Sequence, residues 1–94
     1  MKKFALYLPD DNRISISIQR ETCNKYIEIF NPPDTIEYIN FEDLLNNIEM
    51  YNNLVIFSFT CLGRRVAEIQ AKTDPLKKLN PELNIHFVKE KSYW

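Results

Sequence analysis

The strongest constraint on the fold is an almost unbroken apolar run from Leu54 to Phe59, interrupted by Ser58. Runs of this kind are typical of a central strand that is covered on both faces. We therefore place this segment inside a sheet, with other elements packed on each side of it.

Helical and strand patterns alternate around this run. A helix begins at Asn40, which can cap it, and places apolar residues at the i, i+3, i+4 and i+7 positions of one face. A second helix is predicted from about Cys61 to Lys72, with a short helical turn starting at Asp74-Pro75. Strands are predicted at Thr35–Ile39 and Asn84–Glu90, on either side of the apolar run. The order in this part of the chain is therefore strand–helix–strand–helix–strand, and we expect right-handed crossovers and parallel strands.

The first forty residues give a different pattern. Isoleucines and serines alternate from Arg13 to Gln19, which predicts a strand with one wet face. Turn residues at 9–12 and 20–24 separate it from its neighbours, and connections this short favour antiparallel pairing. The strands predicted in this part are Phe4–Leu8, Arg13–Gln19, Lys25–Phe30 and Thr35–Ile39. The sequence thus predicts a single α+β domain over residues 1–94, with a mixed sheet: an N-terminal antiparallel meander (β-β-β-β) followed by α-β-α-β.

Composition narrows the class of protein. The 94 residues are 45% hydrophobic, which is enough for one core, and the net charge is −1. Residues 1–55 carry a balance of −4 and residues 56–94 a balance of +3. No apolar run approaches the ~20 residues of a membrane span, and no signal peptide is recognised. We expect a cytoplasmic protein with reduced thiols.

The one candidate ligand site lies around Gly63, the single glycine of the chain. Ser58 and Thr60 stand at the predicted strand end, and Arg64 and Arg65 at the start of the next helix. The amino end of a helix offers unpaired N–H groups and a positive dipole end, so anions bind there readily. Hydroxyl groups and arginines could add donors for a phosphate or carboxylate.

A purely structural interpretation of the same residues stays open. Arg64, Glu68 and Lys72 have the i, i+4 spacing of an ordinary charged helix face. Gly63 could serve only to bring the helix close to the sheet. The spacing of a phosphate-binding P-loop is not present.

Other chemistry-bearing residues favour structural roles. Cys61 near two arginines could have a lowered thiol pKa, but the one histidine, His86, is predicted near the start of a parallel neighbouring strand, away from it. Cys23 is predicted in a turn. We therefore assign no catalytic residue, no metal site and no cofactor.

Aromatic residues are frequent on the predicted strands, and an aromatic sheet can bind nucleic acid. However, Glu28 and Glu37 would share the outer surface and repel phosphates, so nucleic acid is not an expected partner.

Tyr93 and Trp94 end the sequence. Large aromatic side chains dock either on their own domain or on a partner, and we assign them to partner binding. Open sheet edges favour a homodimer.

Two functions remain. The first is a small binding or regulatory module that acts by protein–protein interaction, of the kind that mobile elements or viruses use as accessory or inhibitor proteins. The second is a binder or processing enzyme for a phosphate-bearing small molecule, such as a nucleotide, at the junction around Gly63. The sequence favours a binding protein over an enzyme.

Overall fold

Strands and helices alternate along the whole described chain. The computed structural model describes residues 3–10, 14–32 and 34–94. In chain order the elements are β1 (Phe4–Tyr7), α1 (Ile16–Glu28), β2 (Thr35–Tyr38), α2 (Phe41–Asn47), the short 3-10 helix η1 (Ile48–Met50), β3 (Asn53–Ile56), the 3-10 helix η2 (Phe59–Cys61), α3 (Val66–Leu79), β4 (Asn84–Phe87) and β5 (Ser92–Tyr93).

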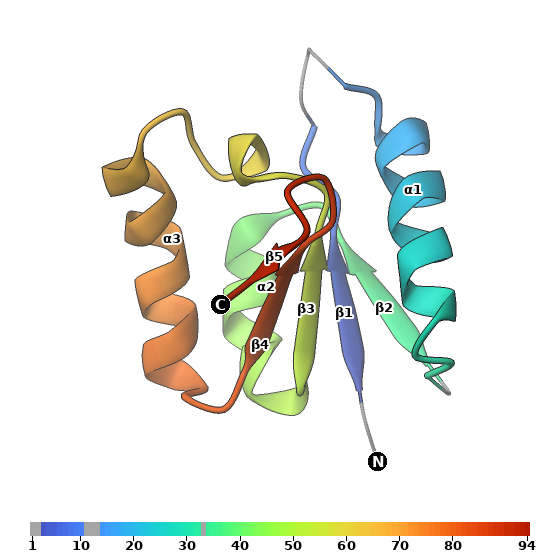
Figure 1. Cartoon of the computed structure of the whole chain (residues 1–94). Coiled ribbons are helices and arrows are strands. Elements are labelled where there is room, and N and C mark those ends of the chain that lie inside the picture. The colour runs from blue at the N-terminus through green and yellow to red at the C-terminus, as the bar shows by residue number, and fades with distance from the viewer. Residues whose placement is uncertain (1–2, 11–13, 33) are drawn as a thin grey trace.

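The strands form one sheet in the order β2-β1-β3-β4-β5 (Figure 1). Strand β1 pairs in parallel with both β2 and β3, and β3 pairs in parallel with β4. The two-residue strand β5 is antiparallel to β4. Each parallel connection passes through a helix, because parallel neighbours cannot be joined by a tight turn. The architecture is therefore α/β.

Helix α1 covers one face of the sheet. Its buried residues Cys23 and Ile27 pack with Phe4 and Leu6 of β1 and with Val55 of β3. These side chains alternate along the strands with those of the other face, as the period of a strand requires.

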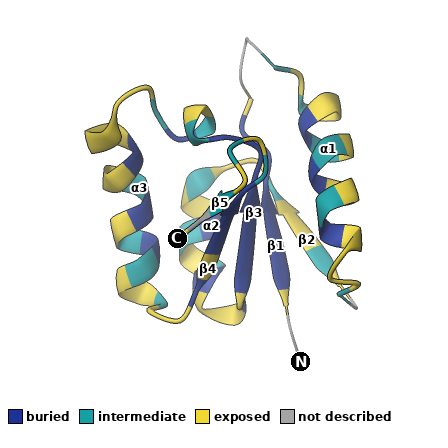
Figure 2. Ribbon diagram, in the orientation of Figure 1, coloured by how far each residue is buried: buried dark blue, intermediate teal, exposed yellow. Residues whose placement is uncertain are grey.

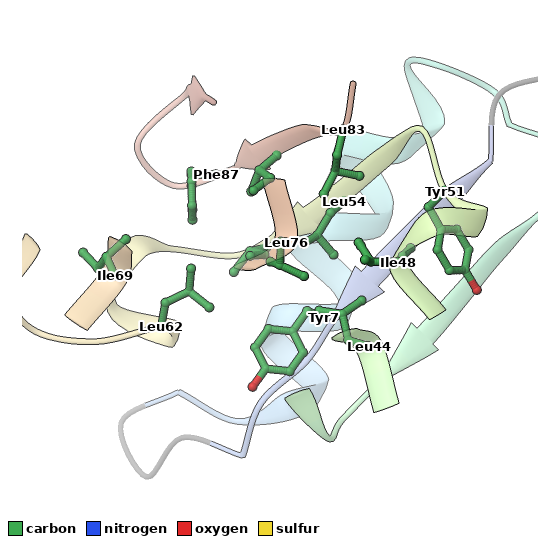
Figure 3. Packing of buried hydrophobic residues seen from close by; sticks show 13 residues of the cluster. Tyr7, Leu44, Ile48, Tyr51, Leu54, Leu62, Ile69, Leu76, Leu83 and Phe87 are labelled. Atoms are coloured by element: carbon green, nitrogen blue, oxygen red, sulfur yellow. The ribbon is translucent and has the colours of Figure 1, made fainter. Parts of the chain in front are cut away.

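Helices α2 and α3 cover the opposite face. Leu44 of α2 and Leu76 of α3 pack with Leu54 of β3 in the larger core cluster (Figure 3). Strands β1 and β3 are buried at every position, whereas β2 is largely half-buried or exposed (Figure 2). The core thus lies on both faces of the two central strands.

The predicted α+β class with an N-terminal antiparallel meander was wrong. Residues 16–28 form helix α1, so the strand predicted at Arg13–Gln19, the turn at Arg20–Asn24 and most of the strand at Lys25–Phe30 do not exist. Arg13 itself lies outside the described residues. Strand β2 is present, but it pairs in parallel with β1.

The alternation of isoleucine and serine was misleading for a physical reason. Gln19, Cys23 and Ile27 are spaced four residues apart and form the buried stripe of α1. The buried stripe of this helix thus begins with a polar side chain, Gln19, which weakens the apolar period of about 3.6 residues in the sequence. Ile18, predicted to lie in a sheet, is 55% exposed.

The elements predicted after residue 35 are present, but their bounds differ: β3 ends at Ile56 and β4 at Phe87. Helix α3 begins at Val66, not near Cys61, and continues through Asp74-Pro75 to Leu79. Cys61 belongs to η2 instead. Arg64 therefore precedes the helix and cannot form the predicted i, i+4 face with Glu68.

The N-cap of α1 gives a direct test of this correction. The Ser15 hydroxyl accepts a hydrogen bond from the Ile18 backbone N–H at 3.2 Å. Ser15→Ala should therefore lower the free energy of unfolding by about 1 kcal/mol, as measured by urea denaturation. Ser17→Ala should leave stability unchanged or raise it slightly, because Ser17 lies inside the helix and alanine is the better helix former. Two serines on the wet face of a strand would instead respond alike.

Candidate functional site

The candidate site lies at the carboxyl edge of the parallel strands. Strand β1 has β2 on one side and β3 on the other, so the chain leaves β1 toward α1 and leaves β3 toward α3, on opposite faces. Open α/β sheets form their ligand crevices at such a switch point. The segment from Ser58 to Arg65 begins there.

Ser58 is fully buried, and its hydroxyl forms a hydrogen bond with the side-chain carboxylate of Glu90. The Ser58 Oγ donates to Glu90 Oε2 at 2.7 Å, and the Phe59 backbone N–H donates to Glu90 Oε1 at 3.1 Å. Thr60 donates from its backbone N–H and from its hydroxyl to the same Ser58 oxygen, at 3.2 and 3.1 Å. Of the donors predicted for an external anion, the Ser58 hydroxyl thus binds Glu90 in the structure, and Thr60 binds Ser58.

Sequence reasoning missed Glu90. It lies 32 residues from Ser58 and follows β4 in the turn that leads to β5. We had placed it at the end of a longer strand, Asn84–Glu90, where its side chain had no assigned role. No local sequence signal pairs these two positions, because the contact depends on the parallel register of β3 and β4.

Gly63 is required by close packing. A Cβ atom at this position would lie 2.5 Å from the Cβ of Glu68, far inside the van der Waals contact distance. The backbone at Gly63 does not have a positive φ, so conformational freedom is not the reason. The glycine lets the segment before α3 run against the first turn of that helix, so the close approach is to α3 and not to the sheet.

Arg64 and Arg65 are exposed at the start of α3. Arg65 occupies the N-cap position in an extended conformation, and its side chain makes no capping hydrogen bond. The Glu68 carboxylate lies 3.5 Å from the Arg64 backbone nitrogen, so a carboxylate of the chain also stands at this helix end. Lys72, the third residue of the predicted charged helix face, instead places its Nζ atom 4.7 Å from the centroid of the Phe41 ring.

Trp94 docks on its own domain and remains partly exposed. Its backbone N–H donates to Ile85 at 2.8 Å, and its carbonyl accepts from Ile85 at 2.9 Å. The ring centroid lies 5.3 Å from those of Phe59 and Phe87, and 40% of the residue remains exposed. Tyr93 pairs with His86 through the strand backbone.

Gln19 joins the two connections that leave the switch point. This fully buried amide donates from Nε2 to the Pro9 carbonyl at 3.0 Å and to the Ile14 carbonyl at 3.2 Å. The Cys61 thiol approaches Gln19 Oε1 at 3.8 Å. Burial raises the pKa of Cys23 to about 12, so this thiol stays protonated at neutral pH. The contacts of Gln19 stabilise the edge.

His86 lies in a separate polar cluster near the start of β3. Its Nε2 lies 2.8 Å from Asn53 Oδ1, which accepts, and its Nδ1 lies 2.7 Å from the Tyr26 hydroxyl. The ring contacts Phe4 and Phe30, with centroids 6.2 and 5.5 Å away. Burial lowers the pKa of His86. The cluster is therefore a neutral, hydrogen-bonded part of the core under α1.

Neither a metal-binding cluster nor a membrane-spanning helix is found among the described residues. No group of three or more His, Cys, Asp or Glu side chains is placed to hold a metal ion there. None of the described helices combines the length and apolar character that crossing a membrane requires.

Comparisons with known proteins inform the fold. No family model matches the sequence, and no curated protein matches it. Among solved structures, the chain is similar to the crystal structure of a resolvase family site-specific recombinase from Streptococcus pneumoniae, with a TM-score of 0.77 and 15% sequence identity. The match covers 99% of this chain and 76% of that one. At this identity the similarity shows a shared α/β, resolvase-like fold.

The His86 cluster predicts how stability depends on pH. The unfolded chain protonates His86 near pH 6.5, whereas the folded protein does so only at lower pH. The unfolded state therefore binds more protons in this window, so the free energy of unfolding should fall as pH decreases from 7.5 toward 5. Each unit of pKa difference contributes about 1.4 kcal/mol.

Urea denaturation of the wild type and His86→Gln across this pH range isolates the effect. The stability difference between the two proteins should shrink as pH falls, because only the wild type must take up a proton at this position. Stability curves that remain parallel over the whole range would show that His86 does not carry this dependence.

Proposed function

We propose that this protein is a small binding module that acts by association with another protein. The observation that carries the proposal is the state of Trp94. Two backbone hydrogen bonds and two ring contacts fix its position, while 40% of the residue faces outward. Tryptophan is enriched among the residues that dominate binding energy, and a side chain that is already fixed loses little entropy when a partner covers it.

We name this region the C-terminal aromatic surface: it consists of the partly exposed Trp94 and the two rings that Trp94 contacts, the half-buried Phe59 and the buried Phe87. Figure 1 shows that the connections that follow β3 and β4 lie at the carboxyl edge of the parallel strands. The exposed residues Arg64, Arg65, Lys89 and Lys91 lie in the connections that follow β3 and β4. Glu90, between the two lysines, is bonded to Ser58.

This distribution of charge defines the chemistry of the partner. An apolar or aromatic side chain from the partner would cover Trp94, and neighbouring aspartate or glutamate residues would face the cations. Such pairing steers association and makes its rate depend on ionic strength.

The fold suggests the first partner to test. A chain with the fold of a resolvase family recombinase can present surfaces like those of a recombinase subunit, so it is suited to associate with such an enzyme as an accessory or inhibitor. This step rests on similarity of fold alone.

Calorimetric titration into a purified resolvase family recombinase tests the proposal. We expect binding by the wild type, and a loss of at least tenfold in affinity for Trp94→Ala, since a central tryptophan typically contributes 2 kcal/mol or more. Met50→Ala removes another large apolar side chain, 56% exposed in η1, and should bind normally. Equal binding by all three proteins would contradict a role for the C-terminal aromatic surface. If no recombinase binds, the proposed partner class is wrong.

One specific observation supports a second function, the binding of a phosphate-bearing small molecule. Arg64 and Arg65 are both exposed beside the amino end of a 14-residue helix whose N-cap side chain makes no capping hydrogen bond. The Ser58 hydroxyl could contribute only if the ligand displaced Glu90, and Thr60 only if it gave up its hydrogen bonds to Ser58. This site would therefore depend on the two arginines and the helix end.

Thermal melts with a panel of nucleotides test this second function. Binding would raise the melting temperature with ligand concentration. The double variant Arg64→Ala, Arg65→Ala should lose the shift, whereas Lys25→Ala, Lys78→Ala, which removes two exposed charges elsewhere, should keep it. A wild-type melt that no nucleotide shifts would exclude this function.

A further inference from the structure

Strand β2 leaves one edge of the sheet without a described neighbour. Its four residues pair with β1 on one side, and it stands last in the strand order, at the opposite edge from β5 (Figure 1). Backbone N–H and C=O groups on the outer side of an edge strand can pair with a further strand. This edge is therefore separate from the C-terminal aromatic surface.

The hydrogen bonds to β1 show which backbone groups point outward. The Leu8 N–H donates to the Tyr38 carbonyl at 2.8 Å, so Tyr38 directs its backbone groups toward β1. Successive residues of a strand direct their backbone groups to opposite sides. Ile36 therefore also faces β1, while Thr35 and Glu37 direct their N–H and C=O groups toward open solvent.

The side chains of β2 differ between the two faces. Ile36 stands in register with Ala5, which belongs to the core cluster under α2 and α3, and it is 47% exposed. Glu37 lies on the face of α1, where Arg20 Nε donates to both carboxylate oxygens at 3.2 and 3.0 Å. The charge of Glu37 is thus balanced within the same chain.

We propose that two copies of this chain associate through antiparallel pairing of their β2 strands, with Ile36 opposite the Ile36 of the second copy. A two-fold axis at Ile36 places Thr35 opposite Glu37, and these are the residues whose backbone groups point outward. Both pairs of residues can then exchange hydrogen bonds, and the sheet continues across the dimer.

Charge and side-chain contacts select this register. Ile36 meets its own copy in a non-hydrogen-bonded pair, where side chains approach most closely. On the other face, threonine meets glutamate, and each glutamate keeps its Arg20. A shift that centres the axis on Glu37 would place two carboxylates directly opposite each other, which is unfavourable.

Solution mass tests the dimer. Sedimentation equilibrium should give twice the monomer mass for the wild type in the micromolar range. Ile36→Lys should be monomeric, because it places two ammonium groups opposite each other, and far-UV circular dichroism should show that it remains folded. Met50→Lys carries the same change at another exposed apolar position and should remain dimeric.

Cross-linking tests the register. Directly opposed residues have Cβ atoms about 4.5–5.5 Å apart, close to disulfide geometry. Ile36→Cys should therefore form an intermolecular disulfide at least tenfold faster than Met50→Cys under the same oxidant. A monomeric wild type, a dimer that persists in Ile36→Lys, or equal cross-linking rates would each overturn the proposal. None of these outcomes depends on Trp94, so the proposed function would stand or fall separately.

Discussion

Burial of β1 on both faces is the constraint on which the rest of the structure depends. Phe4, Leu6 and Leu8 face α1, while Ala5 and Tyr7 face α2 and α3, and none of the five is more than 5% exposed. A strand in this position needs helical cover on each side and parallel neighbours reached through those helices. An antiparallel meander over the first forty residues could not supply such cover.

The same arrangement determines what the carboxyl edge can do. The connections after β1 and β3 separate there, and Gln19 fastens one to the other through the Pro9 carbonyl and Cys61. Glu90 then closes the end of β3 by bonding Ser58 and Phe59. The edge is stabilised by the chain's own polar groups.

Much of this fold could be predicted from local pattern, and part of it could not. The apolar run at Leu54–Phe59 marked β3, because its consecutive apolar residues are all buried, and the spacing after Asn40 marked α2, because its apolar residues Phe41, Leu44 and Leu45 pack on the core. Helix α1 was missed because its buried stripe contains Gln19, whose burial depends on backbone carbonyls from another segment. For the site, Gly63 was found at once, whereas its reason, the approach of Glu68, and the Ser58–Glu90 contact required the tertiary structure.

The most direct test of the account is the pattern of backbone nuclear Overhauser effects in the isotopically labelled protein. The parallel register predicts contacts between the β1 and β3 backbones, around Ala5 with Leu54 and Leu6 with Val55. It also predicts sequential amide–amide contacts along Ile16–Glu28, as in any helix. Antiparallel contacts between residues 4–8 and residues 14–19 would contradict the α/β fold and everything inferred from it.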